Sequence, residues 1–153
     1  SEQMYGDKGE VPDGEYTIPI GVADIKREGS DVTIVSFGKI IKEAYKAADE
    51  LEKENISCEI IDLRTVRPMD HDAIFNSVKK TNRLVILEEA WPFGNVSTEI
   101  TYQVQSQLFD YLDAPIEKIN TADTPAPYSP VLLKEWLPNS VDVINAVKKV
   151  LYK

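Results

Sequence analysis

The sequence predicts an α/β protein built around a mostly parallel sheet. Two apolar runs of strand length, Cys58 to Leu63 and Arg83 to Leu87, flank about a dozen residues with helical spacing. A strand, a helix and a second strand in this order form a parallel crossover unit, which is almost always right-handed. A further run, Val32 to Phe37, is apolar and β-branched enough to be buried on both faces, which places it in the centre of the sheet.

The helix of the crossover unit is expected from about His71 to Thr81. Asp70 precedes this helix and can cap its first turn, while Pro68 keeps its own predecessor out of helical geometry. Ile74 and Val78 lie one turn apart and would face the sheet.

The first half of the chain supplies two more elements. Ala23 to Arg27 can form a short strand, and a helix at about Ile40 to Glu54 follows the central strand. The inner face of that helix is expected to consist of Ile41, Ala44, Tyr45, Ala48 and Leu51.

The second half continues the alternation of helices and strands. A loop from Glu88 to Asn95 leads into a helix, whose inner residues are expected to be Ile100, Val104 and Leu108. A last strand at Ile116 to Thr121 precedes a connector, residues 122–130, whose three prolines exclude regular structure. After a short segment around Leu132 to Trp136, Ser140 is expected to cap a final helix. The inner face of the final helix is expected to consist of Ile144, Val147 and Leu151.

Residues 1–20 are predicted to be an interdomain linker or arm, and residues 21–153 a single domain. Glycines and prolines among charges interrupt the first 20 residues too often for a helix or a regular strand. A chain of 153 residues suits one hydrophobic core. Because the arm also carries Tyr5, Tyr16 and Ile18, we interpret it as following another domain, and the chain as a fragment of a longer protein.

The composition excludes several classes of partner. The net charge of −9 repels phosphate backbones, which argues against nucleic-acid binding and favours a basic partner protein. No apolar run approaches the roughly 20 residues that cross a bilayer, and the first residues lack the pattern of a secretory signal. We therefore expect a cytoplasmic protein with no membrane partner.

The one cysteine and the one histidine predict no site of their own. Cys58 cannot form an internal disulfide, and together with His71 it cannot make a zinc cluster. Cys58 opens an apolar strand, so we expect a buried, inert thiol. His71 lies on the first turn of a helix, where a solvated or capping role is expected.

Two carboxylates are placed where open α/β sheets usually bind ligands. Glu88 and Glu89 follow a strand at its C-terminal end. Acid-base catalysis by them is conceivable, but a solvated edge or a contact that caps a helix is the expected role. The central strand ends at Gly38 without the glycine-rich pattern of a nucleotide-binding loop.

Two arginines could hold an anion. Arg64 and Arg67 are, however, expected to form ion pairs with Asp62 or Asp70. We therefore assign no catalytic, cofactor-binding or metal-binding residue to this chain.

Several segments resemble one family in order and in detail. They are TIVSFG (33–38), EIIDLRTVRPMD (59–70), NRLVILEEAWPFG (82–94), DTPAPYSP (123–130), WLPN (136–139) and DVINAVKKVLYK (142–153). These segments resemble the beta subunit of pyruvate dehydrogenase, and more narrowly its C-terminal, transketolase-type domain. The resemblance covers essentially the whole chain. Ala90, Asn95 and Ser97 depart from it, because many relatives have glycines in this region.

The resemblance implies a fold and a division of labour. The implied fold has three layers, α/β/α, with a five-stranded mostly parallel sheet and one antiparallel edge strand at Ala23 to Arg27. In the family, thiamine diphosphate and magnesium lie between the alpha subunit and the N-terminal domain of the beta subunit. The whole enzyme decarboxylates pyruvate and acetylates lipoyl groups. The resemblance therefore implies that this chain binds no cofactor and is inactive in isolation.

The resemblance also implies partners. They are the alpha subunit, a second beta subunit and the peripheral-subunit-binding domain of the dihydrolipoyl acetyltransferase. For docking to the last of these, the resemblance points to Asp113 and to the terminal carboxylate on Lys153. The second beta subunit is expected to contact exposed apolar residues, for which the candidates are Trp91, Phe93 and Tyr128.

Two alternatives stay open. The same domain could belong to a branched-chain 2-oxo acid dehydrogenase, because the substrate would be selected by residues outside this chain. Alternatively, the chain could be a free-standing enzyme or small-ligand binder. That reading would use the strand ends around Ser36, Gly38, Glu88 and Glu89.

Overall fold

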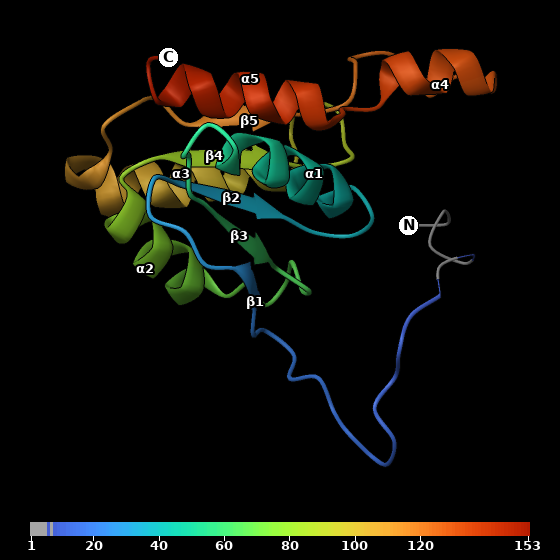
Figure 1. Ribbon diagram of the computed structural model, residues 1–153, viewed down its shortest axis with the longest axis horizontal. Coiled ribbons are helices and arrows are strands. Elements are labelled where there is room, and N and C mark those ends of the chain that lie inside the picture. Colours follow the sequence, from blue (N-terminus) through green and yellow to red (C-terminus); the bar gives the residue numbers. More distant parts are fainter. Residues whose placement is uncertain (1–5, 7) are drawn as a thin grey trace.

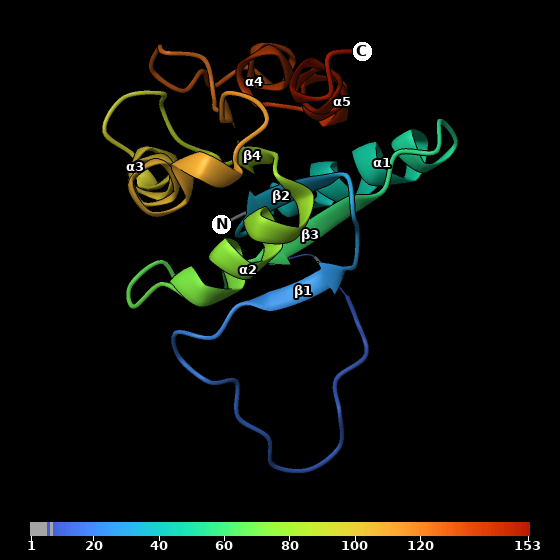
Figure 2. The same ribbon diagram turned by 90° about the vertical axis from the view of Figure 1, so that its left-hand side faces the viewer.

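The computed structural model describes residue 6 and residues 8–153, so positions 1–5 and 7 of the predicted arm lie outside the described residues. Residues 8–20 contain no helix or strand and extend away from the sheet (Figures 1 and 2). The division into an arm of residues 1–20 and a domain of residues 21–153 stays a prediction.

The described residues form one five-stranded sheet, in the order β1-β3-β2-β4-β5. The strands are β1 (Asp24–Arg27), β2 (Val32–Ser36), β3 (Cys58–Asp62), β4 (Leu84–Leu87) and β5 (Glu117–Ile119). β1 runs antiparallel to β3, and the other neighbours are parallel. This confirms the mixed sheet, the central position of β2 and the antiparallel edge strand.

Helices cover both faces of the sheet, which confirms the three layers (Figures 1 and 2). α1 (Ile41–Glu52) and α5 (Ser140–Val150) pack on one face, and α2 (His71–Thr81) and α3 (Val96–Leu108) on the other. The short α4 (Pro130–Trp136) and the 3₁₀ helix η2 (Phe109–Tyr111) complete the helical elements of the described residues. Within residue 6 and residues 8–153, no helix has the length and hydrophobicity of a membrane span.

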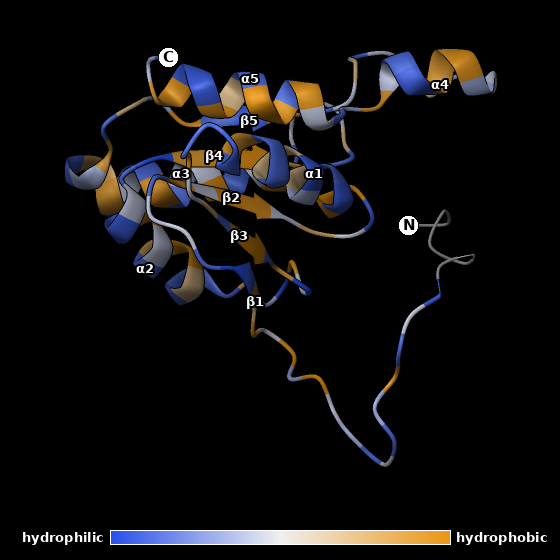
Figure 3. Cartoon of the chain, viewed as in Figure 1, coloured by the Kyte–Doolittle hydropathy of each residue, from blue (hydrophilic) through white to orange (hydrophobic). Residues whose placement is uncertain are grey.

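The side chains of β2 alternate between two hydrophobic cores. Ile34 belongs to the core shared with α1 and α5, and Val35 to the core shared with α2 and α3. Residues in register with each on β3 and β4 lie on the same face. The strands of the sheet are coloured as hydrophobic in Figure 3, because they contribute apolar side chains to the helices on both faces.

The predicted bounds of α2 are confirmed, and so is its cap. Asp70 Oδ1 accepts a hydrogen bond from the N–H of Ala73 at 3.0 Å. The other oxygen, Oδ2, accepts one from the N–H of Ala23 at 2.9 Å. One carboxylate therefore starts the helix and also fixes the approach to β1.

The predicted cap of the final helix is wrong by one residue. Asn139 caps α5, in a capping box with Asp142. Asn139 has an extended backbone, so its side chain reaches the first N–H groups of the helix, whereas Ser140 already lies inside the helix. The predicted inner face is also shifted, because Ile144 and Leu151 are only partly buried. The fully buried residues of α5 are Val143, Ala146, Val147 and Val150.

A buried carboxylate joins β3 to α2 and to the turn after β1. Glu59 is 1% exposed, and its Oε2 pairs with Lys80 and accepts a hydrogen bond from the N–H of Gly29 at 3.2 Å. A Cβ at Gly29 would lie 2.2 Å from the backbone carbon of Cys58. Glycine is therefore required here, because any side chain would push the turn away from the carboxylate.

This carboxylate predicts an acid-sensitive stability. Burial raises the pKa of Glu59, but hydrogen bonds from Lys80 and Gly29 outweigh burial and hold the pKa below its ordinary value. A lowered pKa in the folded state stabilises the protein above the unfolded-state pKa, and that contribution is lost as the pH falls through the folded-state pKa.

We expect Glu59→Gln to lower the free energy of unfolding at pH 7 by roughly 1–3 kcal/mol, because the charge-assisted contacts are lost. Urea unfolding between pH 7 and pH 3 should show the gap between variant and parent narrowing as the pH falls. The exposed Glu50, which pairs with Lys53, provides the control Glu50→Gln. A gap that is constant across this range contradicts the assignment.

Candidate functional site

The C-terminal ends of the central strands are closed by internal hydrogen bonds. The hydroxyl of Ser36 is buried and donates to the carbonyl oxygen of Leu87 at 2.8 Å. Glu88 is 1% exposed, and its Oε1 accepts hydrogen bonds from the N–H of Ser97 and from Nδ2 of Asn120, both at 3.1 Å. Ser97 lies in the first turn of α3, so the predicted helix-capping contact of Glu88 is confirmed.

This contact uses Glu88 to hold the fold together. A carboxylate at a helix N-terminus is stabilised by the unpaired N–H groups and by the helix dipole. The second oxygen of Glu88 is buried without a hydrogen-bond partner among the described residues. Glu89 is exposed and shares a hollow of about 230 Å³ with Phe37, Gly38 and Lys39. No serine, threonine, cysteine or histidine is among the residues that line this hollow.

The cysteine and the histidine also lack reactive surroundings. Cys58 is buried, and burial raises the pKa of its thiol to about 12, so the thiol is protonated at neutral pH. The predicted inert thiol is confirmed. His71 is half-buried against Phe75, with the ring centroids 5.8 Å apart, and Asp70 rather than His71 caps the helix.

The predicted pairing of Arg64 is wrong. Its guanidinium pairs with Asp24 on β1, because the antiparallel register places Asp24 opposite Asp62. Asp62 accepts a hydrogen bond from the backbone N–H of Arg64 at 3.0 Å, and Asp70 serves the cap of α2. Arg64 thus joins the edge strand to the end of β3.

The described residues offer no clustered site for the magnesium ion that the sequence resemblance implies for the whole enzyme. They contain no group of three His, Cys, Asp or Glu side chains that could hold a metal ion. A magnesium ion bound to diphosphate needs oxygen ligands from the protein. The resemblance assigns those ligands to other parts of the enzyme.

The structure brings Asp113 close to the C-terminus. Arg83 Nη2 lies 3.3 Å from Asp113 Oδ2, and Arg83 Nε donates to the carbonyl oxygen of Val150 at 3.1 Å. The hydroxyl of Tyr152 donates to the carbonyl oxygen of Asp113 at 3.1 Å. Lys153 follows and is exposed. The loop that contains Asp113 is therefore fastened to the end of α5.

Sequence reasoning missed Arg83 and Tyr152. A basic residue immediately before an apolar strand was a signal for Arg83, since its charge must find a partner beside the sheet. Tyr152 gave no such signal, because its contact depends on a left-handed backbone with φ of 56° at the chain end. The side chain of Asp113 is 56% exposed and so still faces solvent beside Arg83.

The predicted contact residues Trp91, Phe93 and Tyr128 are all exposed. The indole N–H of Trp91 and that of Trp136 both donate to the carbonyl oxygen of Thr124, at 3.1 and 2.8 Å. The two indoles therefore hold the proline-rich connector in place.

Comparison with known proteins identifies the family. Residues 21–143 match the family described as transketolase, C-terminal domain. The chain belongs to this family. Individual relatives are similar to the chain over almost its whole length.

The chain is 52% identical over 152 residues to the pyruvate dehydrogenase E1 component subunit beta of Rickettsia felis, covering 99% of this chain and 47% of that protein. It is 46% identical over 147 residues to the acetoin:2,6-dichlorophenolindophenol oxidoreductase subunit beta of Bacillus subtilis, covering 96% of this chain and 43% of that protein. The chain thus spans less than half the length of either relative.

A solved structure described as a split gene transketolase, inactive beta4 tetramer, superposes with a TM-score of 0.78 and 26% identity. It covers 94% of this chain and 46% of that chain. The resemblance seen in the sequence is confirmed in both family and fold.

The hydrogen bonds of Glu88 predict that this side chain contributes to stability. Glu88→Ala should lower the free energy of unfolding by about 1–3 kcal/mol, because the N–H of Ser97 and the amide of Asn120 lose a buried acceptor. Chemical denaturation measures this change. The exposed neighbour gives the control, Glu89→Ala, which should change stability by less than about 0.5 kcal/mol. Equal effects of the two substitutions would show that Glu88 does not hold α3.

Proposed function

We propose that the chain is the C-terminal assembly and docking domain of the beta subunit of an acetyl-transferring pyruvate dehydrogenase. The observation that carries the proposal is the 52% identity to the Rickettsia felis subunit across 99% of the chain. In this proposal the whole enzyme, in the cytoplasm, performs the thiamine diphosphate-dependent oxidative decarboxylation of pyruvate. It then acetylates a lipoyl group.

In the proposal this chain supplies no catalytic residue. The internal bonds of Ser36 and Glu88 support this, because they commit two polar side chains at the strand ends to holding the fold. The remaining part of the beta subunit and the alpha subunit hold thiamine diphosphate and magnesium. The relative described as an inactive beta4 tetramer supports the expectation that the isolated chain is inactive.

Assembly uses two exposed regions. Residues 1–20 connect the domain to the rest of the beta subunit, and their described part carries the exposed apolar residues Tyr16, Ile18 and Ile20. Phe93 and Tyr128 offer apolar surface to the second beta subunit. Such a contact between identical subunits uses the same patch twice.

Docking uses the surface at the end of α5. Asp113 and the carboxylate of Lys153 meet basic residues of the peripheral-subunit-binding domain of the acetyltransferase. The net charge of −9 supports this, because opposite charges accelerate association. Arg83 and Lys153 place positive charge beside these carboxylates, so the partner must compete with Arg83 for Asp113.

A second substrate assignment is favoured by one observation, the 46% identity to the acetoin oxidoreductase subunit of Bacillus subtilis. A branched-chain 2-oxo acid dehydrogenase is a further alternative, because the substrate is selected outside this chain. All three assignments keep the same role for this domain.

The substrate assignment is tested on the whole beta subunit that contains this chain, reconstituted with its alpha subunit and thiamine diphosphate. We expect kcat/KM for pyruvate to exceed that for acetoin and for 3-methyl-2-oxobutanoate by at least about tenfold, measured by reduction of dichlorophenolindophenol. A preference for acetoin or for the branched substrate overturns the pyruvate assignment. The 153-residue chain, assayed in parallel, should show no turnover.

Docking is tested by titrating the chain with the cognate peripheral-subunit-binding domain at low and high salt. Asp113→Asn should weaken binding about fivefold or more at low salt and less at high salt, because screening weakens the lost attraction. Asp110→Asn removes an exposed charge three residues away and should bind like the parent. Docking lies elsewhere if Asp113→Asn binds at full strength and salt has no effect.

A further inference from the structure

β5 is an edge strand with an open side. It pairs only with β4 among the described strands, in register from Val85 and Glu117 to Leu87 and Ile119. The N–H of Glu88 donates to the carbonyl oxygen of Ile119, so Ile119 directs its backbone groups toward β4. Because successive residues of a strand point in opposite directions, Lys118 and the following Asn120 direct their N–H and C=O outward.

These outward groups have no backbone partner. Among the described residues, no backbone hydrogen bond reaches Asn120, and none on the open side reaches Lys118. Unpaired groups of this kind form a template for another extended segment. Proteins often protect such an edge with a charged side chain, but Lys118 is directed elsewhere. Its ammonium donates to Thr98 Oγ1 at 2.9 Å and to the carbonyl oxygen of Pro92 at 3.1 Å.

The chain itself already pairs with the end of this edge. The next outward residue is Ala122, and its N–H donates to the carbonyl oxygen of Trp136 at 3.0 Å. The two residues belong to different elements, since Trp136 is the last residue of α4. The edge therefore accepts backbone pairing, and the pairing stops before Asn120.

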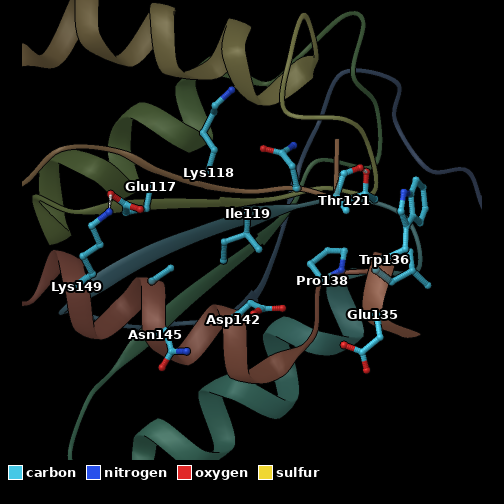
Figure 4. A pocket seen from close by; sticks show the side chains of 14 residues that line it. Glu117, Lys118, Ile119, Thr121, Glu135, Trp136, Pro138, Asp142, Asn145 and Lys149 are labelled. Carbon is cyan, nitrogen blue, oxygen red and sulfur yellow. Dashed lines mark hydrogen bonds and ion pairs between the residues drawn. The ribbon is translucent and has the colours of Figure 1, made fainter. Parts of the chain in front are cut away.

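A cleft of about 500 Å³ lies along the open edge (Figure 4). β5 and the residues after it form one wall, and α5 and the turn before it form the other. Glu117 and Ile119 point into the cleft side, toward α5, whereas Lys118 points to the opposite side (Figure 4). Pro138 and Ala146 add apolar surface to the lining. An extended chain beside β5 would place alternate side chains in this cleft.

Three carboxylates and two lysines line the cleft. Glu117 is neutralised by Lys149, at 2.8 Å. Glu135 and Asp142 also line the cleft, and Glu135 makes no ion pair with a described residue. These carboxylates favour a segment that carries lysine or arginine.

We propose that the open edge of β5 binds an extended, basic segment of a partner protein. The segment pairs with Lys118 and Asn120 through backbone hydrogen bonds and places its basic side chains beside Glu135 and Asp142. This is strand addition, a common mode of peptide recognition. The proposal does not depend on the pyruvate assignment or on a docking role of Asp113, which precedes the first residue of β5, Glu117, by four residues.

The probe is the peptide acetyl-Lys-Val-Lys-Val-Lys-Val-amide, titrated into the ¹⁵N-labelled 153-residue chain. We expect the amide resonances of Lys118 and Asn120 to shift and their hydrogen exchange to slow. The same peptide with Glu in place of Lys should bind at least about tenfold more weakly. A backbone N-methylated Lys peptide should not bind, because it cannot donate to the edge. No binding at millimolar peptide, or shifts confined to other strands, overturns the proposal.

Two pairs of variants separate the edge from the side chains. Lys118→Pro removes the side chain and also the outward backbone N–H, which has no backbone partner among the described residues. Lys118→Ala removes the side chain but keeps this N–H, so the two variants differ in the backbone donor. Binding should fall about tenfold between Lys118→Ala and Lys118→Pro. Glu135→Gln should weaken binding severalfold, whereas Glu15→Gln in the arm should not. Equal binding by Lys118→Ala and a folded Lys118→Pro contradicts strand addition. If Lys118→Pro does not fold, the N-methylated peptide tests strand addition on the unchanged protein. Binding of this peptide at full strength would then contradict strand addition.

Discussion

The burial of β2 between two layers of helices is the constraint on which the rest of the structure depends. Every residue from Val32 to Ser36 is buried, so the strand needs a neighbour on each side and a helix over each face. Parallel crossovers place β3 and β4 on its two sides with helices between them. The C-terminal ends of these three strands consequently lie together at one end of the sheet.

Open α/β sheets usually bind ligands at this end, and here two of its polar side chains stabilise the fold instead. Ser36 bonds to the end of β4, and Glu88 holds the start of α3. A negative charge that a catalytic site could use is thus committed to a helix N-terminus. Several open surfaces lie away from these strand ends: the end of α5, the exposed aromatic residues and the outer side of β5. Each of these suits contacts with other chains.

Much of the fold was predictable because its signals are local. Asp70 and the periodicity after it gave both the bounds and the cap of α2. The cap of α5 was misplaced because Asn139 and Ser140 are both good capping residues, and only the backbone decides between them. The partner of Arg64 was missed because Asp24 lies 40 residues away and reaches it only through antiparallel pairing.

The site was less predictable than the fold. The alternation of β5 gave no hint that its outer side stays unpaired, because pairing depends on which element comes to lie beside it. The contacts of Asp113 with Arg83 and Tyr152 join three separate segments. The pattern of residues along the chain does not predict contacts between such distant segments. The resemblance to the family pointed to Asp113, but its contacts with Arg83 and Tyr152 are seen only in the structure.

The central proposal is that this domain supports a thiamine-dependent enzyme without holding its cofactor. Isothermal titration calorimetry of the 153-residue chain with thiamine diphosphate and magnesium tests this claim most directly. The account predicts no saturable heat at millimolar cofactor, because in the proposal the alpha subunit and the rest of the beta subunit hold the cofactor. Saturable binding in the micromolar range would contradict it.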